Sequence, residues 1–128
     1  PTVRDFLAEA AQQLRARGVA AERITLDPGI GFGKTAAQNF ALLARQQELL
    51  ALGYPLLAGW SRKSSLGAVT GVQVAAQRVA ASVCAAVLAV ERGARIVRVH
   101  DVRETVEALA VWRAMQAQER PPAEDNRS

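Results

Sequence analysis

Three short apolar segments alternate with longer segments of helical periodicity, and this alternation constrains the fold more than any other feature of the chain. The apolar segments cover residues 24–26, 55–59 and 94–100. Apolar residues recur three and four positions apart in the segments around them, which are 2–17, 36–51, 74–92 and 102–118. Strands that alternate with helices are joined by helical crossovers and run parallel. The sequence therefore predicts an α/β fold with the order α-βα-βα-βα.

Glycines and polar residues mark where these elements end. Gly18, Gly53 and Gly93 are expected to end the first three helices. Residues 120–128 are polar and are expected to form a disordered tail, which leaves 1–119 as a single domain. Three strands cannot close a barrel, and a small parallel sheet would leave unpaired edges. We therefore expect an incomplete barrel and a further segment, outside this chain, that completes it.

The composition limits the classes of partner. Half of the 128 residues are hydrophobic, which is enough for a packed core. The net charge of +4 is spread along the chain without a basic stripe interleaved with aromatic residues, so nucleic acid is not an expected partner. No apolar run reaches the length of a membrane span, so a membrane is not expected either. The one cysteine, Cys84, excludes an internal disulfide, favours a reducing compartment and is expected to be buried in its helix.

The segment 27–35 (DPGIGFGKT) is similar to a phosphate-binding loop without matching one. The loop of nucleotide hydrolases has the pattern G-x-x-x-x-G-K-[ST], and its first glycine would fall on position 28, which is Pro28. The dinucleotide pattern G-x-G-x-x-G fails as well, because position 34 is Lys34. A glycine-rich turn between a strand and a helix is therefore favoured, with a nucleotide site as the alternative.

Polar residues stand at the carboxyl end of each predicted strand. They are Asp27 after the first strand, Ser61, Arg62 and Lys63 after the second, and Arg98, His100 and Asp101 at the end of the third. Parallel α/β folds bind their ligands at this end of the sheet. The three groups are therefore expected to converge on one face and to form the functional site.

Arg98 and His100 are two positions apart in the predicted third strand, so their side chains are expected to point to the same side. A guanidinium beside an imidazole donor is typical of a binding site for an anion. The structural alternative for Arg98 is an ion pair with Asp27 or Asp101, because a buried arginine needs a partner.

Lys63 and Asp27 also have structural alternatives. A loop lysine such as Lys63 is commonly only solvated. Asp27 could brace the glycine turn, or its carboxylate could accept hydrogen bonds from the amino and ring N–H groups of a ligand. His100 is the only histidine and Cys84 the only cysteine, so a histidine and cysteine metal site is not expected, and no metal ligand is assigned to this chain.

Three motifs occur in a fixed order along the chain. They are LDPGIGFGK at 26–34, LLAGWSRKSSLG at 56–67 and RIVRVHDV at 95–102, with the helix RVAASVCAAVLAVERGA before the last. Together they resemble the C-terminal half of the dihydropteroate synthase family, and the resemblance covers nearly the whole chain except the tail. It implies that the chain forms the last three βα units of a (β/α)8 TIM barrel.

The resemblance also implies a reaction and roles for the polar residues. The reaction condenses 6-hydroxymethyl-7,8-dihydropterin pyrophosphate with p-aminobenzoate, giving 7,8-dihydropteroate and pyrophosphate. The residues implied in pterin binding are Asp27, Gly31, Lys63 and Arg98. Those implied in p-aminobenzoate binding are Phe32, Ser61, Arg62 and Lys63. Arg98 and His100 would bind pyrophosphate, and the catalytic residues would be Lys63, Arg98 and His100.

Further expectations come from the same family. Its members use Mg²⁺, whose ligands are expected outside this chain, and sulfonamides mimic their p-aminobenzoate substrate. They are cytoplasmic and usually form homodimers through their last helices, here 74–92 and 102–118. The residues of the family's N-terminal half cannot be placed on this chain, so we expect the chain alone to have little or no turnover.

Two other hypotheses stay open. A folate- or pterin-binding methyltransferase barrel would share the pterin site, but the loop from Ser61 to Ser64 suits p-aminobenzoate instead. A non-catalytic half-barrel that only binds or assembles is the alternative from outside the enzymes.

Overall fold

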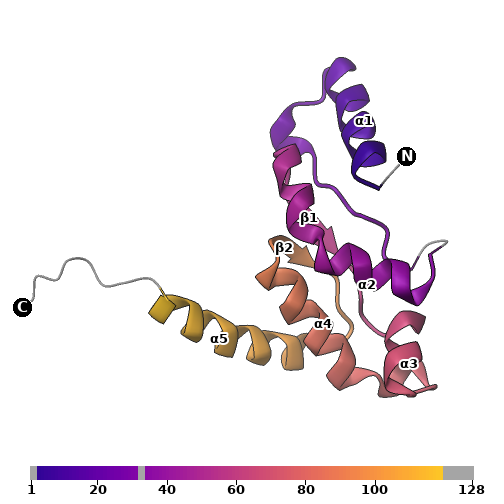
Figure 1. Ribbon diagram of the computed structural model, residues 1–128. Helices are drawn as coiled ribbons and strands as arrows, with labels where there is room; N and C mark the ends of the chain where they lie inside the picture. Colours follow the sequence, from indigo (N-terminus) through magenta and orange to yellow (C-terminus); the bar gives the residue numbers. More distant parts are fainter. Residues whose placement is uncertain (1–2, 32–33, 120–128) are drawn as a thin grey trace, which may run out of the picture.

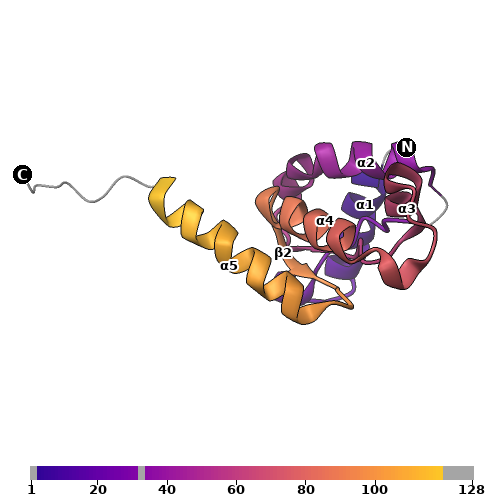
Figure 2. The same ribbon diagram turned by 90° about the horizontal axis from the view of Figure 1, so that it is seen from below.

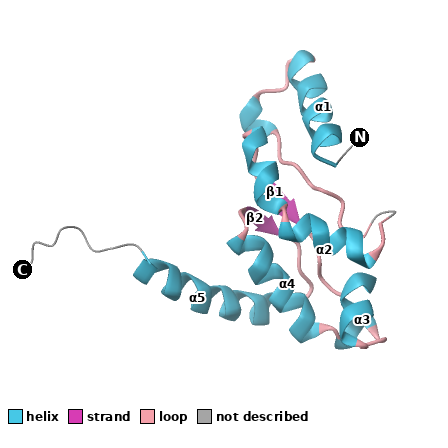
Figure 3. Cartoon of the chain, in the orientation of Figure 1, coloured by secondary structure: helices cyan, strands magenta, loops and turns pink. Residues whose placement is uncertain are grey.

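The computed structural model of the chain describes residues 3–31 and 34–119. Figure 1 follows the chain from its first helix to its last, and Figure 3 shows two short strands among helices that make up most of the fold. Phe32 and the predicted tail 120–128 lie outside the described residues. The architecture is an α/β fold in which helices predominate.

The helices and strands alternate, and every predicted helix has a counterpart. The α-helices are α1 (Val3–Ala16), α2 (Ala36–Ala44), α3 (Ser64–Thr70), α4 (Val79–Glu91) and α5 (Val102–Glu119). Short 3-10 helices lie between them: η1 (Ala21–Arg23), η2 (Gln46–Leu52) and η3 (Ala75–Gln77). The strands are β1 (Leu56–Ala58) and β2 (Ala94–Val97).

The strands β1 and β2 pair in parallel, with α3 and α4 in the crossover between them. Leu56 lies opposite Ala94 in this pairing. The predicted first strand, 24–26, contributes one parallel bridge, from Leu26 to Leu56, rather than a strand. It stops there because Pro28 follows and has no N–H with which to continue the ladder. The sheet therefore runs from the bridge at Leu26 through β1 to β2.

The predicted third strand, 94–100, is shorter than expected, because β2 ends at Val97. The N–H of Arg98 still donates to the carbonyl of Ala58 at 3.0 Å, but β1 ends at that residue and offers no further partner. Arg98 and His100 consequently lie in the loop after the strand and not within it.

The predicted helix 36–51 is divided at Arg45 into α2 and η2. The buried amide of Gln46 donates to the carbonyls of Ala89 (2.9 Å) and Arg92 (3.2 Å), at the end of α4. Buried amides require such partners. This contact with α4 explains why the chain leaves the α-helical path at this point.

The sequence does not predict α3, because Gly67 and Gly71 look like helix breakers. Gly71 does end the helix, with φ of +80°, but Gly67 lies inside it. The predicted helix 74–92 is also shortened: its first residues form η3, and α4 begins at Val79.

Two clusters of buried apolar side chains form the core. The first lies between α2, α3, α4 and the strands and contains Ile30, Leu43, Ala58, Trp60, Leu66, Ala85, Ala89 and Ala94. The second joins α1 to η2 and β1 and contains Leu7, Ala11, Ile24, Leu26, Leu49 and Leu56. The ring of Trp60 packs on Phe40 with centroids 4.9 Å apart, so Trp60 is a packing residue.

Helix α4 turns its small residues toward the core. Ser82, Ala85, Ala86 and Ala89 are buried at helical spacing, whereas Cys84 is exposed. The prediction that Cys84 is buried is wrong, because the helical period carries it away from the core face.

Helix α5 extends away from the body formed by the other helices, and its early turns lie beside α4 (Figure 2). Several of its apolar side chains are exposed: Val102, Val106, Val111 and Met115. In the described part of the chain, no helix combines the length and the apolar character needed to cross a membrane.

We predict that Gly93→Ala destabilises the chain more than Gly53→Ala. Both glycines have φ near +90°, a strain of about 1–2 kcal/mol for an L-residue. A Cβ at Gly93 would lie 2.5 Å from a methyl carbon of Leu50, whereas nothing lies within 4 Å at Gly53. Leu50 is 41% exposed and can move aside, so the close contact adds up to about 1 kcal/mol to the loss at Gly93. Urea unfolding of the two variants measures the difference, and equal losses would contradict this packing.

Candidate functional site

Three loops meet at the carboxyl edge of the sheet. They are residues 27–31 after the bridge at Leu26, 59–63 after β1 and 98–101 after β2. Side chains of the second loop contact each of the other two, a backbone carbonyl in the first and side chains in the third. The predicted convergence of the polar strand ends is therefore present in the structure.

Ser61 and His100 form the contact between the second and third loops. The Ser61 hydroxyl lies 2.7 Å from Nδ1 of His100, and it also accepts the backbone N–H of His100 at 3.1 Å. Ser61 is buried, whereas His100 is exposed. With the ring proton on Nε2, the hydroxyl donates to Nδ1 and the exposed Nε2–H remains a donor for a ligand.

Arg62 and Asp101 form a second contact between the same loops. The guanidinium of Arg62 donates to both carboxylate oxygens of Asp101, at 2.8 and 3.4 Å. This hydrogen bond to Arg62 holds the pKa of the Asp101 carboxyl below its ordinary value, and it raises the pKa of Arg62. Paired charges of this geometry fix one loop against the other.

Lys63 joins the second loop to the glycine loop. Its ammonium donates to the carbonyl of Ile30 at 2.5 Å. Its aliphatic chain runs over Gly31, where a Cβ would lie 3.0 Å from Cδ of Lys63. Burial lowers the pKa of Lys63, and the nearby charge of Arg98 lowers it further. The ammonium of Lys63 is therefore fixed by a hydrogen bond, and Lys63 is not simply a solvated loop residue.

Asp27 and Arg98 join the first and third loops more loosely. One carboxylate oxygen of Asp27 accepts the N–H of Gly29 at 2.8 Å, which braces the turn as the structural alternative predicts. The other lies 3.7 Å from the guanidinium of Arg98, whose side chain is 56% exposed. A Cβ at Gly59 would lie 2.6 Å from that guanidinium, so glycine at this position leaves room for the side chain of Arg98.

The glycine loop is not arranged as a phosphate-binding loop. Phosphate loops present their N–H groups to the ligand. Here the N–H of Gly29 is bonded to Asp27, and that of Gly31 is bonded to Asn39 at 3.0 Å. The ammonium of Lys34 folds back onto the carbonyl of Gly29 at 2.8 Å. These bonds disfavour the nucleotide alternative.

Two buried polar residues, Asn39 and Ser65, support the site and were not predicted from the sequence. The amide of Asn39 accepts from Gly31 and donates to the hydroxyl of Ser65 at 2.8 Å, so it ties the glycine loop to α3. Asn39 is fully buried in α2, four residues before the core residue Leu43. A polar residue on the apolar face of a helix is the signal that could have found it.

Most of the predicted site residues are brought together. Those at the common edge are Asp27, Gly31, Ser61, Arg62, Lys63, Arg98 and His100. Phe32 lies outside the described residues. Among residues 3–31 and 34–119, no three histidine, cysteine, aspartate or glutamate side chains gather as a metal site would require.

The electrostatics of the edge favour an anion. Arg98 lies close enough for its charge to lower the pKa of Lys63, and the carboxylate of Asp27 opposes this effect while contacting Gly29 and Arg98. Asp101 is already paired with Arg62. Two positively charged side chains, Lys63 and Arg98, therefore lie at this edge near the carboxylate of Asp27, and such positive charge attracts anionic ligands.

Comparisons with known proteins give a consistent result. The family described as "Pterin binding enzyme" matches residues 1–100. The dihydropteroate synthase of Neisseria meningitidis serogroup C is 50% identical over an alignment of 123 residues, and the match covers 90% of this chain and 44% of that protein. The chain thus spans less than half the length of the curated relatives it matches.

Two solved structures are similar in fold as well as sequence. Dihydropteroate synthase from Stenotrophomonas maltophilia has a TM-score of 0.89 and 52% identity, covering 90% of this chain and 43% of that one. The enzyme from Xanthomonas albilineans, in complex with 7,8-dihydropteroate, has a TM-score of 0.89 and 50% identity, covering 90% and 44%.

We predict that the carboxyl of Asp101 titrates below its ordinary pKa and that Arg62→Met returns it toward that value. The ion pair of Arg62 with Asp101 stabilises the fold at pH values above the ordinary carboxyl pKa. This contribution is lost as the pH falls through the lowered pKa of Asp101. Carbon-13 NMR titration of the carboxyl measures the midpoint. Arg103→Met is the control, because Arg103 pairs with Glu107 instead. A titration midpoint of Asp101 that does not change in Arg62→Met would contradict the pairing.

Proposed function

The chain belongs to the pterin-binding enzyme family, and we propose that residues 1–119 are the C-terminal portion of a dihydropteroate synthase, a cytoplasmic enzyme of folate biosynthesis. The observation that carries the proposal is the gathering of Asp27, Ser61, Lys63, Arg98 and His100 at one sheet edge. The fold and sequence similarity to dihydropteroate synthases supports it.

The chain would supply the last three βα units of a (β/α)8 barrel. The parallel direction of the Leu26 bridge, β1 and β2 supports this arrangement. In the described residues, the outer edge of β2 has no neighbouring strand, and Ile96 on this strand is 44% exposed. Closure of a barrel would pair this edge and cover this side chain.

The two aromatic substrates would lie between the first and second loops. The carboxylate of Asp27 would accept the amino and ring N–H groups of the pterin, with Lys63 at the carbonyl edge and Gly31 leaving room for the ring. Ser61 would lie near the carboxylate of p-aminobenzoate, with Phe32 and Lys63 lining the same pocket. The guanidinium of Arg62 is held by Asp101, so Arg62 would line that pocket with the rest of its side chain.

The pyrophosphate would lie against the third loop. Arg98 offers an exposed guanidinium, and His100 offers an exposed imidazole whose other nitrogen is fixed by Ser61. A phosphate oxygen can accept from both groups. Binding of the anion would replace the loose 3.7 Å contact that Asp27 makes with Arg98, which frees that carboxylate for the pterin.

The reaction follows from these positions. The amine nitrogen of p-aminobenzoate forms a bond to the methylene carbon of the pterin, and the bond from that carbon to the pyrophosphate oxygen breaks. The oxygen keeps the electron pair, and the amine loses a proton. Negative charge increases on the leaving group, so Lys63, Arg98 and His100 would act by fixed positive charge and hydrogen bonds at that place. An aromatic amine needs no strong base as a nucleophile.

A requirement for Mg²⁺ is expected from the family resemblance alone. The carboxylates of Asp27 and Asp101 are paired with arginines, and no cluster of possible ligands exists in the described ranges. The described residues therefore do not fit a Mg²⁺ site by themselves. The ligands of the ion are expected from segments outside this chain.

We predict that a chimera in which this chain replaces the matching 44% of the Neisseria meningitidis relative has synthase activity. The isolated 128-residue chain should have little or no turnover, since half of the site would be missing. In the chimera, Arg98→Ala should raise the KM for the pterin pyrophosphate by roughly ten- to hundredfold, the effect of about 1.5–3 kcal/mol from a charged hydrogen bond. The KM for p-aminobenzoate should change far less.

Arg95→Ala is the matched control, because Arg95 is an exposed arginine of β2 that lies before the carboxyl edge. It should leave both KM values unchanged. Equal effects of Arg98→Ala on the two substrates would mean that Arg98 is only structural. Turnover by the isolated chain at a rate normal for an enzyme would overturn the expectation that it needs a further segment, and an inactive chimera would favour the non-catalytic half-barrel.

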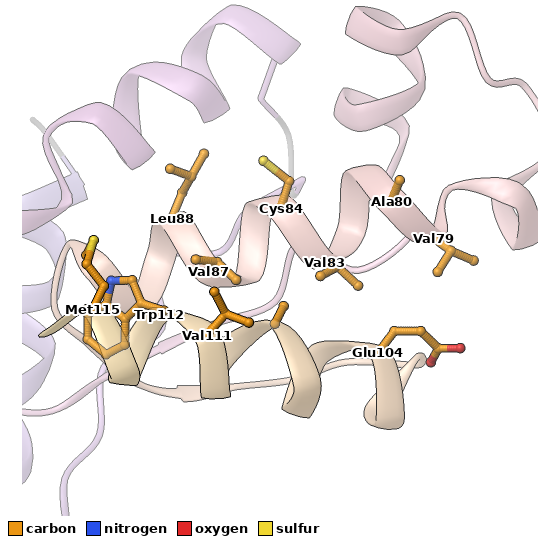
Figure 4. A pocket seen from close by; sticks show the side chains of 11 residues that line it. Val79, Ala80, Val83, Cys84, Val87, Leu88, Glu104, Val111, Trp112 and Met115 are labelled. Atoms are coloured by element: carbon orange, nitrogen blue, oxygen red, sulfur yellow. The ribbon is translucent and has the colours of Figure 1, made fainter. Parts of the chain in front are cut away.

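We also propose that the groove between α4 and α5 is the contact surface of a homodimer. Figure 4 shows apolar side chains of both helices along this groove, among them Val83, Val87, Val111, Trp112 and Met115. Val111 is 73% exposed. A continuous apolar surface of this kind on two neighbouring helices supports burial against a second copy.

The single cysteine allows a direct test, because Cys84 lies in the groove. We predict that the protein sediments as a dimer and that Val111→Glu gives a monomer whose Cys84 reacts severalfold faster with a thiol reagent. Val69→Glu is the control, since Val69 is 62% exposed but lies on α3. A monomeric parent protein, or the same result from both variants, would exclude this surface.

A further inference from the structure

Arg62 has an unusual backbone conformation. Its φ of +60° is the one positive value among the non-glycine residues that the structure describes. This left-handed region is unfavourable for an L-residue with a long side chain, so the surrounding structure must hold it there. The turn lies between Ser61 and Lys63, which are two residues of the proposed site.

Two side chains of the first turn of α4 and its N-cap hold the backbone of Arg62. The N–H of Arg62 donates to the hydroxyl of Ser82 at 2.8 Å. The carbonyl of Arg62 accepts from Nη1 of Arg78 at 2.9 Å. The hydroxyl of Ser82 in turn donates to the backbone carbonyl of Arg78, which fixes its orientation. The N–H and the carbonyl of Arg62 are therefore both held by residues at the N-terminal end of α4.

The guanidinium of Arg78 is itself fixed by other contacts. It donates to the carbonyls of Val72 (2.8 Å) and Gln73 (3.1 Å), in the segment that follows α3. It also lies against Gly67, where a Cβ would be 2.5 Å from Nη2. No carboxylate pairs with Arg78 within the described ranges, so its hydrogen bonds to the three carbonyls are the contacts that orient it.

The conformation of Arg62 sets the relative direction of its neighbours. Ser61 points to His100 on one side of the turn, and Lys63 points to Ile30 on the other. A change of φ at Arg62 would rotate one of these side chains relative to the other. Since the side chain of Arg62 is also anchored on Asp101, a released backbone could relax without losing the ion pair.

We propose that Arg78 and Ser82 are positioning residues that hold Arg62 in its left-handed conformation and so set the p-aminobenzoate pocket formed by Ser61 and Lys63. This inference rests on the function proposed above for those two residues. The pyrophosphate would be bound from the third loop, by Arg98 and His100, which Arg78 does not touch. Loss of the hydrogen bonds from Arg78 and Ser82 should therefore weaken p-aminobenzoate most, with a smaller effect on the pterin pyrophosphate, which Lys63 also meets.

The first test is a kinetic one in the active chimera. Arg78→Lys keeps the charge but cannot reach three carbonyls, and it should raise the KM for p-aminobenzoate roughly tenfold, as a small misplacement of positioned groups does. Ser82→Ala should act in the same direction. The KM for the pterin pyrophosphate should rise less, by roughly two- to threefold, because Lys63 also meets the pterin and Ser61 fixes His100, whereas Asp27 and Arg98 stay in place.

Arg92→Lys is the matched control. Arg92 stands at the other end of α4, and its guanidinium also reaches a backbone carbonyl, that of Ala44 at 3.5 Å. It should leave the KM for p-aminobenzoate unchanged. A proportional rise of both KM values in Arg78→Lys, or the same p-aminobenzoate effect from Arg92→Lys, would show general destabilisation and overturn the proposal.

A second test does not depend on activity. In the 128-residue chain, the three-bond coupling between the amide and Cα protons of Arg62 reports its φ, and it should change in Arg78→Lys and in Ser82→Ala but not in Arg92→Lys. An unchanged coupling in the first two variants would overturn the positioning role. If the unmutated chimera is inactive, the proposed synthase function fails, and the coupling still decides whether Arg78 and Ser82 hold the turn.

Discussion

The parallel pairing of β1 with β2, extended by one bridge at Leu26, is the constraint on which the site depends. Parallel strands end at the same edge, so the loops that follow them must start side by side. The helices cover the sheet, and the edge carries the polar residues. The few backbone hydrogen bonds that pair the strands in parallel therefore bring the polar side chains of the site together.

Each loop at this edge is fixed by a different kind of contact. The glycine loop is braced by Asp27 and held by the buried amide of Asn39. The loop after β1 is held by the ion pair of Arg62 with Asp101 and by the hydrogen bond from Arg78 to the carbonyl of Arg62. The contact between Asp27 and Arg98 is the loosest, at 3.7 Å. The loosest of these contacts thus joins two of the groups proposed to meet the pterin and the pyrophosphate, while the tighter contacts hold the loops in place.

The convergence of the polar residues that follow the strands could be predicted from the sequence, because strands that alternate with helices run parallel and end at one edge. The exact strand ends could not, since the first strand is a single bridge and the third ends at Val97. The contacts that support the site could not. Asn39 bonds Ser65, 26 positions later, and Arg78 bonds Arg62, 16 positions earlier, and only tertiary packing brings these partners together. Helix α3 was missed because Gly67 resembles a breaker, although in the folded chain it makes room for Arg78. The burial of Cys84 was wrong for the related reason that composition does not tell which face of an Ala-rich helix meets the core.

The crystal structure of the chimera bound to 7,8-dihydropteroate would test the central claim most directly. We expect the pterin to lie between Asp27 and Lys63, with the p-aminobenzoyl group beside Ser61 and with the Arg62 turn unchanged. A product bound away from the edge formed by the three loops would contradict the assignment of this edge as the functional site.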